Sequence, residues 1–401
     1  MSARKYVFLS AALDIMDLHN PLLARTGAIL RRNRYCIWDT LDYTIRYATR
    51  FGRREGSLFF PTRGCRHEAA GGCTMCDYGL GPRIRAEAMI DSVRRGMKEL
   101  PKDLNFVKVT PSGSFLDQLE VPVQARRAIV ELMRKSPYPA LGFESRAETL
   151  ASGALEECRS RLEGHRVRVM VGLESSDPWI SKYSINKSQS RDMFVSGISR
   201  LNRLSMASCA NVLLGAPFLS EKESIEDTVR TVRWALEKGS DECCIYPANV
   251  KRWTHAAWFY ERGFYTPPSL WSLVEVLRRL SAEIAVSKIR INWYRSYSAY
   301  NVIHSPQTCT HCYSHVVRYV DAYAETNDYS FIEKAVRYNC RCKNTWSINL
   351  EQDQKIHRVE RAVAAYEAMA RDLLGAEWWK QRGQKIIARI ESDAREPVAI
   401  N

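Results

Sequence analysis

The stretch that decides the fold spans residues 57–79 and reads SLFFPTRGCRHEAAGGCTMCDYG. It opens with a short apolar run at 57–61, which is typical of a buried strand. A loop follows in which three cysteines have the spacing C-x7-C-x2-C: Cys65, Cys73 and Cys76. Two thiolates in a C-x2-C turn can face one centre. The pair Gly71-Gly72 allows the loop to fold back, so that the first cysteine joins them.

Similar apolar runs follow along the chain, each ending in a loop. They span residues 105–110, 140–144, 166–173, 211–214 and 243–246. Amphipathic stretches of helix length separate them, for example 225–238. Strand, loop and helix repeated six times predict an α/β fold with parallel strands and crossover helices. We expect a partial (βα)6 barrel, with a doubly wound sheet as the alternative. In both folds the chemistry lies at the carboxyl ends of the strands.

Three regions are expected. Residues 1–55 form a basic N-terminal extension with several stretches that read as helical, and residues 56–295 form the barrel. Residues 289–294 could add one more strand. Residues 296–401 form a C-terminal extension with four further cysteines and an amphipathic helix over 352–374, which Gly375 ends.

Composition narrows the class of protein. The chain has 401 residues, of which 45% are hydrophobic and 26% charged, and this excludes a disordered or collagen-like chain. Lys and Arg exceed Asp and Glu by 59 − 45 = 14. Such an excess suits nucleic acid or another anionic partner, and equally a basic, solvated surface. No apolar run reaches the ~18 residues of a spanning helix. The short patch at 7–13 is read as part of the fold. We expect a cytoplasmic protein with no membrane contact.

The three cysteines of the first loop indicate a metal centre. Three thiolates suit a [4Fe–4S] cluster that keeps one iron open. A structural zinc would need a fourth ligand, for which His67 and Asp77 are nearby candidates. The position of the loop after the first predicted strand favours the cluster.

A second set of cysteines lies near the C-terminus: Cys309, Cys312, Cys340 and Cys342. Four converging thiolates predict a zinc site. An auxiliary iron–sulfur cluster and a site for trivalent arsenic are the alternatives. Three histidines that flank the set could replace one cysteine: His304, His311 and His315. The remaining cysteines are expected to be small buried hydrophobic residues: Cys36, Cys158, Cys209, Cys243 and Cys244.

The chain resembles the radical S-adenosylmethionine (SAM) enzymes. In that superfamily a three-cysteine loop after the first strand of a partial barrel holds [4Fe–4S], and the open iron binds SAM. The commonest spacing there is C-x3-C-x2-C, and longer first gaps occur in the elongator-like branch. Within that branch the sequence resembles the radical SAM subunit of archaeosine synthase, the RaSEA family, over roughly residues 57–346. The similar segments are 71–76, 113–117, 120–122, 144–146, 172–174, 185–187, 217–221 and 340–342.

This resemblance implies roles for loop residues. Ser112, Gly113 and Ser114 would accept the methionyl amine of SAM through backbone carbonyls. Glu174 would bind the ribose or the amine, with Glu144 at the neighbouring strand end, and Lys187 or Arg146 would pair with the carboxylate. Gly215 and Pro217 would lie against the adenine. Cys65, Cys73 and Cys76 would carry the catalytic cluster.

The resemblance also implies a reaction. The reduced cluster would cleave SAM to methionine and a 5′-deoxyadenosyl radical, with electrons from a reductase or a flavodoxin-type donor. The substrate would be a modified 7-deazaguanine in tRNA, where the family cleaves a lysine adduct to leave the amidine of archaeosine. One alternative is a small-molecule relative that transfers the 3-amino-3-carboxypropyl group of SAM to arsenite, as in arsinothricin biosynthesis. A second is a zinc-stapled RNA-binding protein without enzymatic activity.

Overall fold

The structure is a computed structural model that describes residues 21–32, 43–79, 81, 83–187, 189–292, 301–352 and 356–395. Four parts of the sequence predictions lie outside the described residues: the apolar patch at 7–13, Cys36, the end of the extra strand at 293–294, and the part of the C-terminal helix at 353–355. No described helix is both long enough and apolar enough to cross a membrane.

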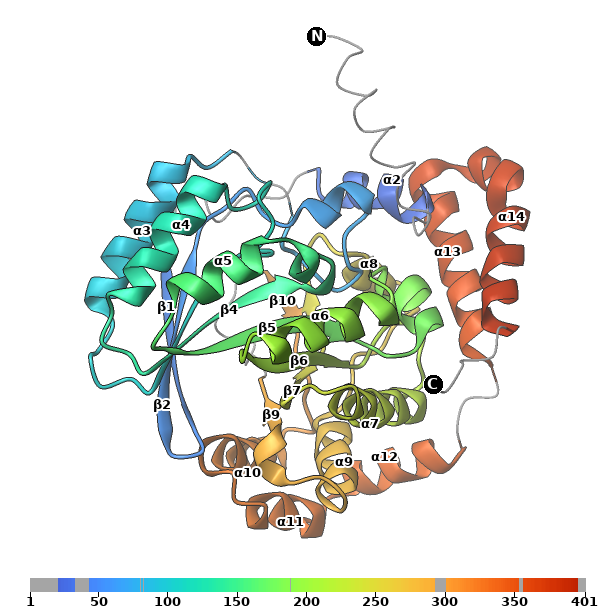
Figure 1. Cartoon of the computed structure of the whole chain (residues 1–401). Helices are drawn as coiled ribbons and strands as arrows, with labels where there is room; N and C mark the ends of the chain where they lie inside the picture. The colour runs from blue at the N-terminus through green and yellow to red at the C-terminus, as the bar shows by residue number, and fades with distance from the viewer. Residues whose placement is uncertain are drawn as a thin grey trace.

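An eight-stranded sheet with the order β1-β2-β3-β4-β5-β6-β7-β9 curls into an open barrel (Figure 1). All neighbours from β2 to β9 are parallel. These strands are β2 (Arg53–Phe60), β3 (Phe106–Pro111), β4 (Ala140–Arg146), β5 (Arg166–Glu174), β6 (Ala207–Leu214), β7 (Glu242–Pro247) and β9 (Ile289–Ile291). The predicted α/β partial barrel is therefore confirmed, including an additional strand at 289.

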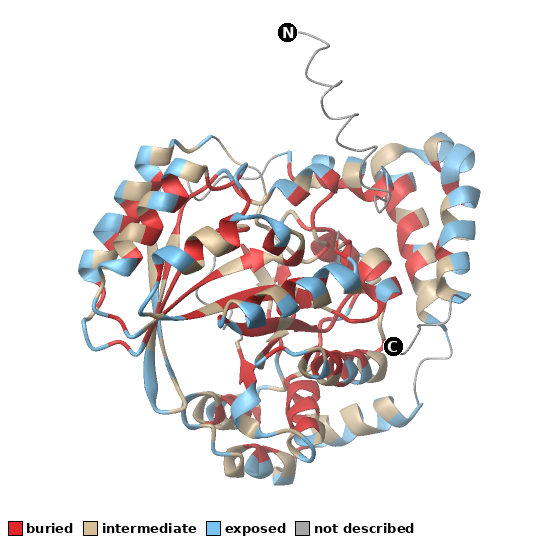
Figure 2. Ribbon diagram, in the orientation of Figure 1, coloured by how far each residue is buried: buried red, intermediate tan, exposed pale blue. Residues whose placement is uncertain are grey.

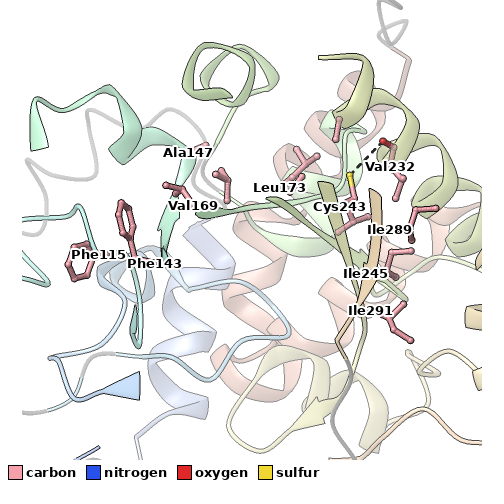
Figure 3. Close-up of a cluster of buried hydrophobic side chains, with 14 of the residues drawn as sticks. Phe115, Phe143, Ala147, Val169, Leu173, Val232, Cys243, Ile245, Ile289 and Ile291 are labelled. Atoms are coloured by element: carbon pink, nitrogen blue, oxygen red, sulfur yellow. Dashed lines mark hydrogen bonds between the residues drawn. The ribbon is translucent and has the colours of Figure 1, made fainter. Parts of the chain in front are cut away.

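Helices cover the outside of the barrel. They are α3 (Ala86–Glu99), α4 (Val123–Arg134), α5 (Ala154–Arg161), α6 (Arg191–Arg203), α7 (Glu221–Glu237) and α9 (Leu270–Ser281), with short helical turns η3 (Ala147–Ala151) and η5 (Val286–Lys288). Buried residues of the strands and of the helices form one apolar core between sheet and helices, as the burial colours of Figure 2 indicate, and Figure 3 draws part of this core. In that core the Cys243 thiol donates a long hydrogen bond to the Val232 carbonyl. Cys243 is a buried hydrophobic residue, as predicted.

The N-terminal extension contains a strand where helices were expected. β1 (Thr44–Arg50) pairs antiparallel with β2 through a turn at Phe51 and Gly52, which have φ values of 54° and 70°. A guanidinium nitrogen of Arg50 donates to the Ile291 carbonyl at 2.6 Å, so the first and last strands of the sheet meet. This hydrogen bond links β1 to β9 across the opening of the barrel.

A second apolar core joins the two ends of the chain. Here α2 (Pro21–Leu30) packs with α8 (His255–Glu261), α13 (Arg358–Leu374), α14 (Ala376–Arg395) and the π-helical segment η4 (Ile180–Ile185). Gly375, with φ of 93°, ends α13 as predicted, but the helix begins at Arg358 and not at residue 352, which ends α12 (Arg341–Gln352). The long helix α14 that follows was not anticipated. In Figure 1 the α13–α14 hairpin stands beside α2, at the flank of the barrel.

The remaining elements lie after the barrel. A two-stranded sheet joins β8 (Val250–Lys251) to β10 (Val302–His304). Helices α10 (Tyr313–Thr326), α11 (Ser330–Arg337) and α12 (Arg341–Gln352) form a group next to α9. The interior of this group includes Cys312, Val316, Tyr323 and Ile332, all of which are buried.

Candidate active site

The three-cysteine loop follows β2 at the carboxyl edge of the parallel strands. Cys65 precedes the short 3-10 helix η2 (Arg66–Ala70), and Gly71 and Gly72 have φ values of 95° and 66°. These positive values let the chain fold back toward Cys73. A Cβ atom at Gly71 would lie 2.7 Å from the backbone of Leu23, so the glycine also lets α2 pack onto the loop.

The three thiols lie close enough to raise one another's pKa. Burial is the main cause of the shift: it raises the pKa of the Cys65 thiol to about 12 and raises that of Cys73 and Cys76. Their sulfur atoms do not form a set within 4.8 Å, which among the described residues only the four C-terminal cysteines do. Three half-buried thiols spaced too widely for one ion fit a [4Fe–4S] cluster, whose irons each take a separate thiolate.

The two residues considered as a fourth zinc ligand are both engaged elsewhere. The Nε2 atom of His67 lies 2.6 Å from the Asn186 carbonyl oxygen. The carboxylate of Asp77 pairs with Lys251 at 2.7 Å and accepts a hydrogen bond from Asn301. Within the described part of the chain, the three cysteines therefore have no fourth ligand in place, which matches a cluster with one open iron.

Segment 184–187 straps the cysteine loop from one side. Asn186, in the left-handed conformation with φ of 58°, donates from Nδ2 to the carbonyls of Ala70 and Gly72 at 3.1 and 2.8 Å. The Thr74 hydroxyl donates to the Ser184 carbonyl at 2.7 Å. The sequence had singled out 185–187 only by resemblance. The structure shows that its backbone fixes the position of the loop.

Helix α2 holds the loop from the other side, which sequence reasoning missed. The Arg31 guanidinium, just after the helix, donates to the Gly71 carbonyl at 2.7 Å and pairs with Glu68 at 3.3 Å. Arg31 is only 8% exposed, so it is an internal clamp although it lies in a basic segment. No local pattern in the sequence marks a contact across forty residues.

Arg146 links the cysteine loop to the loop after β3. One guanidinium nitrogen lies 3.3 Å from the Cys65 sulfur and 2.5 Å from Glu120, and other nitrogens bind Asp117 and Glu148. Glu120 in turn accepts the backbone N–H groups of Arg66 and Ser114 at 2.8 and 2.6 Å. Arg146 was expected to pair with the SAM carboxylate. In this structure it binds carboxylates of the protein itself.

The predicted loop Ser112–Ser114 lies directly against the cysteine loop. Gly113 has φ of 142°, and a Cβ atom there would lie 2.2 Å from a Glu120 oxygen and 3.4 Å from the Cα of Cys65. The Ser112 hydroxyl is buried and has no hydrogen-bond partner among the described residues. Gly113 thus lets the loop lie close to Cys65 and Glu120, and the Ser112 hydroxyl beside it is unused.

A cavity of about 170 Å³ brings three of the predicted residues together: Cys76, Glu144 and Glu174. Glu144 pairs with Lys108 at 2.5 Å, and Glu174 pairs with Lys187 at 3.0 Å. Glu174 has φ of 66°, a left-handed conformation that costs about 1 kcal/mol or more in a non-glycine residue and is concentrated at functional sites.

Two other residues of this cavity have unused oxygen atoms. The side-chain carbonyl oxygens of Asn211 and Asn249 are buried and lack hydrogen-bond partners among the described residues. Lys251 and Tyr246 also line the wall. The inward position of Asn211 on β6 follows from strand alternation and could have been found from it.

A chamber of about 460 Å³ continues into the barrel and shares Phe59, Lys108, Tyr246 and Asn292 with the first cavity. Charged residues line part of its wall. Among them, Arg290 pairs with Glu55 and Glu242 at the amino ends of the strands. Barrels of this type are usually filled by branched apolar side chains. This polar chamber leaves room for part of a polar ligand below the cysteine loop.

Gly215 and Pro217 lie apart from these cavities. Gly215 lines a separate cavity of about 560 Å³, its carbonyl accepts the Tyr265 hydroxyl at 2.6 Å, and Pro268 packs where a Cβ would stand. The Pro217 carbonyl accepts the Ser184 hydroxyl. The structure thus does not bring these two residues to the cavity that holds Cys76.

The C-terminal cysteines converge as predicted. Sulfur–sulfur distances are 3.5 Å for Cys309–Cys312 and Cys309–Cys340, 3.4 Å for Cys312–Cys342, and 3.6 Å for Cys340–Cys342. The backbone N–H of Cys312 and the neighbouring thiols lower the pKa of Cys309 to about 6. The four sulfurs can hold a metal ion.

Comparison with known proteins agrees with the sequence resemblance. No family model matches the chain. Archaeosine synthase subunit beta of Methanosarcina acetivorans is 29% identical over 300 residues, covering 74% of this chain and 84% of that protein. An uncharacterized protein of Methanocaldococcus jannaschii is 28% identical over 308 residues, covering 75% and 82%. The solved structure of Elp3 from Methanocaldococcus infernus aligns with a TM-score of 0.42 and 16% identity over 64% of this chain and 59% of that one. The expected resemblance is thus confirmed: over three quarters of its length, the chain is similar to archaeosine synthase subunit beta.

Proposed function

We propose that the chain is a radical SAM enzyme that acts on a modified 7-deazaguanine in tRNA. The observation that carries the proposal is the cysteine loop. Three half-buried thiols, spaced too widely for one ion and without a fourth ligand in place among the described residues, lie at the carboxyl end of the first parallel strand. The similarity to archaeosine synthase subunit beta supports the substrate, as does the positive excess of 14.

The residues of the chain would divide the work as follows. Cys65, Cys73 and Cys76 would hold a [4Fe–4S] cluster, which, once reduced by a reductase or flavodoxin-type donor, supplies one electron for cleavage of SAM to methionine and a 5′-deoxyadenosyl radical. Glu144 and Glu174, which line the cavity beside Cys76, would accept hydrogen bonds from SAM hydroxyl or amine groups.

Lys187 lies beside Glu174 and could pair with the SAM carboxylate once ligand is bound. The unused oxygens of Asn211 and Asn249 face the same cavity and could accept hydrogen bonds from SAM or substrate. The chamber inside the barrel adjoins this cavity. It would receive the part of the modified base that reacts.

The test is the product of SAM cleavage by anaerobically reduced enzyme. Formation of 5′-deoxyadenosine, stimulated by tRNA that carries the modified base, is expected. Methylthioadenosine would indicate transfer of the 3-amino-3-carboxypropyl group, and a colourless protein without SAM cleavage would indicate a zinc-stapled RNA-binding protein. Cys73→Ala should abolish cleavage, because a cluster without one thiolate is lost or wrongly ligated. Cys158→Ala, which removes a buried thiol of the core, is the matched control.

A further inference from the structure

The four C-terminal cysteines have the dimensions of a site for one ion. Four of their six sulfur–sulfur distances lie between 3.4 and 3.6 Å, and all six are within 4.8 Å. Zinc with four sulfur ligands at about 2.3 Å is tetrahedral, which sets the sulfur–sulfur edge at about 3.8 Å. In a [4Fe–4S] cluster each thiolate binds a different iron, and in a [2Fe–2S] cluster the four thiolates are divided between two irons, so the four sulfurs do not all surround one ion and some of them stand farther apart.

We propose that Cys309, Cys312, Cys340 and Cys342 bind a single tetrahedral thiophilic cation, zinc, in a closed structural site. The proposal is independent of SAM chemistry. The sequence left three possibilities open for these cysteines. The proposal selects zinc over an auxiliary iron–sulfur cluster and over a substrate site for arsenic.

The surroundings of the thiols are those of a finished coordination shell. Cys312 is fully buried and Cys340 is 8% exposed. The indole N–H of Trp271, on α9, donates to the Cys342 sulfur at 3.3 Å, as outer-shell donors do at thiolate sites.

The flanking histidines do not join the set of ligand atoms. His304 contacts Tyr260, and the Nδ1 atom of His315 accepts a hydrogen bond from Arg318 at 2.8 Å. Four thiolates thus complete the shell without a histidine and leave no coordination position for a substrate.

The site is also separated from the proposed active site. None of the four cysteines lines the cavity beside Cys76 or the chamber inside the barrel. Cys312 and Cys340 instead belong to the apolar core between the sheet and its outer helices. A substrate bound there would not reach the cysteine loop.

The ion would join α10 to α12. Helix α10 lies at the seam of the barrel, which is the junction between the edge strands β1 and β9. Two ligands precede α10 and two lie at the start of α12, about thirty residues later. At the other end of α10, the Tyr323 hydroxyl donates to the Ile289 carbonyl of β9 at 3.4 Å, and the Glu325 carbonyl accepts the Gly52 N–H at 2.9 Å. Helix α10 therefore contacts both edge strands, so a metal that fixes α10 also stabilises their junction.

Metal analysis tests the identity of the ion. The triple variant Cys65→Ala/Cys73→Ala/Cys76→Ala leaves all four C-terminal thiols intact. It should contain about one zinc per chain, without iron or acid-labile sulfide. Cobalt in place of zinc should give the intense visible bands of a tetrahedral thiolate complex. Iron with sulfide, or no bound metal, in this variant would overturn the proposal. Wild-type protein with reconstituted cluster gives the same answer if the variant fails to fold: one zinc beside the irons supports the site, and a second set of cluster irons refutes it.

Hydrogen exchange tests the structural role. In Cys309→Ser/Cys312→Ser protein, amides of residues 50–52 and 289–291 should exchange faster, and zinc should be lost. Cys158 is a buried residue of α5 and belongs to neither cysteine set, so Cys158→Ser should leave exchange at these positions unchanged. Unchanged exchange at the seam in a zinc-free double variant would show that the site does not stabilise it. A failure of SAM cleavage in wild-type protein would bear on the proposed function and not on this site.

Discussion

The guanidinium of Arg146 lies 3.3 Å from the sulfur of Cys65, and buried carboxylates hold it there. Of these carboxylates, Glu120 is so desolvated that burial raises its pKa despite the arginine. A fixed positive charge beside one cluster ligand gives Arg146 a positioning role, with consequences for both stability and redox potential.

Replacing Arg146 separates these two effects. Arg146→Gln should lower the free energy of unfolding by about 3–5 kcal/mol, because Glu120 would remain buried without this ion pair and Asp117 would keep only its pair with Arg66. It should also shift the midpoint potential of the proposed cluster to more negative values, because the cation lost from beside Cys65 would favour the reduced state. Arg146→Lys should keep the potential near wild type while losing stability, since lysine lacks the planar fork of donors. Potentiometric titration and denaturant unfolding are the measurements. Equal potentials in wild type and Arg146→Gln would contradict the assigned role.

The contact between Arg31, at the end of α2, and the cysteine loop predicts a loss of stability when Arg31 is replaced. Arg31→Ala removes the hydrogen bond to the Gly71 carbonyl and the ion pair with Glu68, so it should destabilise the protein by about 1.5–3 kcal/mol. It should also speed the release of iron to a chelator. Arg25→Ala, on the exposed face of the same helix, is the control and should behave like wild type. Iron release that is equally fast in both variants would show that the clamp does not protect the site.

Glu174 should matter for SAM binding and not for cluster content. Glu174→Gln keeps the shape of the side chain and removes its charge, so we expect about a tenfold increase in the KM for SAM, with iron and sulfide content unchanged. One lost charge-assisted hydrogen bond has this size, about 1.4 kcal/mol. Exposed Glu163→Gln serves as the control. If the KM does not change, Glu174 serves only its ion pair with Lys187.

Stability should fall in acid partly through His255. Burial lowers the pKa of this histidine from 6.5 to about 3, with a further contribution from the charge of Arg31. Between these pH values the unfolded chain binds a proton at this site and the folded chain does not. The free energy of unfolding should therefore decrease by about 1.4 kcal/mol per pH unit as the pH drops below 6.5. His255→Gln removes this term, so its unfolding free energy between pH 6.5 and 5 should fall less steeply than that of wild type. Parallel curves for the two proteins would refute the assignment.

Sequence reasoning identified the features that local patterns encode. The strands that became β2 to β7 have compact apolar runs, and the cysteine sets have fixed spacings, so both could be predicted. The convergence of Cys309 with Cys340 could be predicted because each belongs to a closely spaced pair of cysteines. Glu144 and Glu174 line one cavity, because both end parallel strands and such ends share one edge of the sheet.

Features that depend on contacts between residues far apart in the chain could not be predicted from local sequence patterns. Strand β1 has Arg46 and Arg50 among its residues, and its turn, Phe51-Gly52, is a weak hairpin signal. The burial of Arg31 depends on a carbonyl forty residues away. Arg146 looked like a ligand-binding cation, because the sequence does not show that three carboxylates of the chain surround it.

The contacts around the cysteine loop also set the order in which the site can be completed during synthesis. Helix α2 leaves the ribosome before the loop that it holds, whereas Asn186 and the segment that begins α8 emerge after more than a hundred further residues. The cysteines are thus translated long before the loop is enclosed. During this interval an iron–sulfur carrier would reach the three thiols from open solvent, and the later segments would then seal the delivered cluster inside.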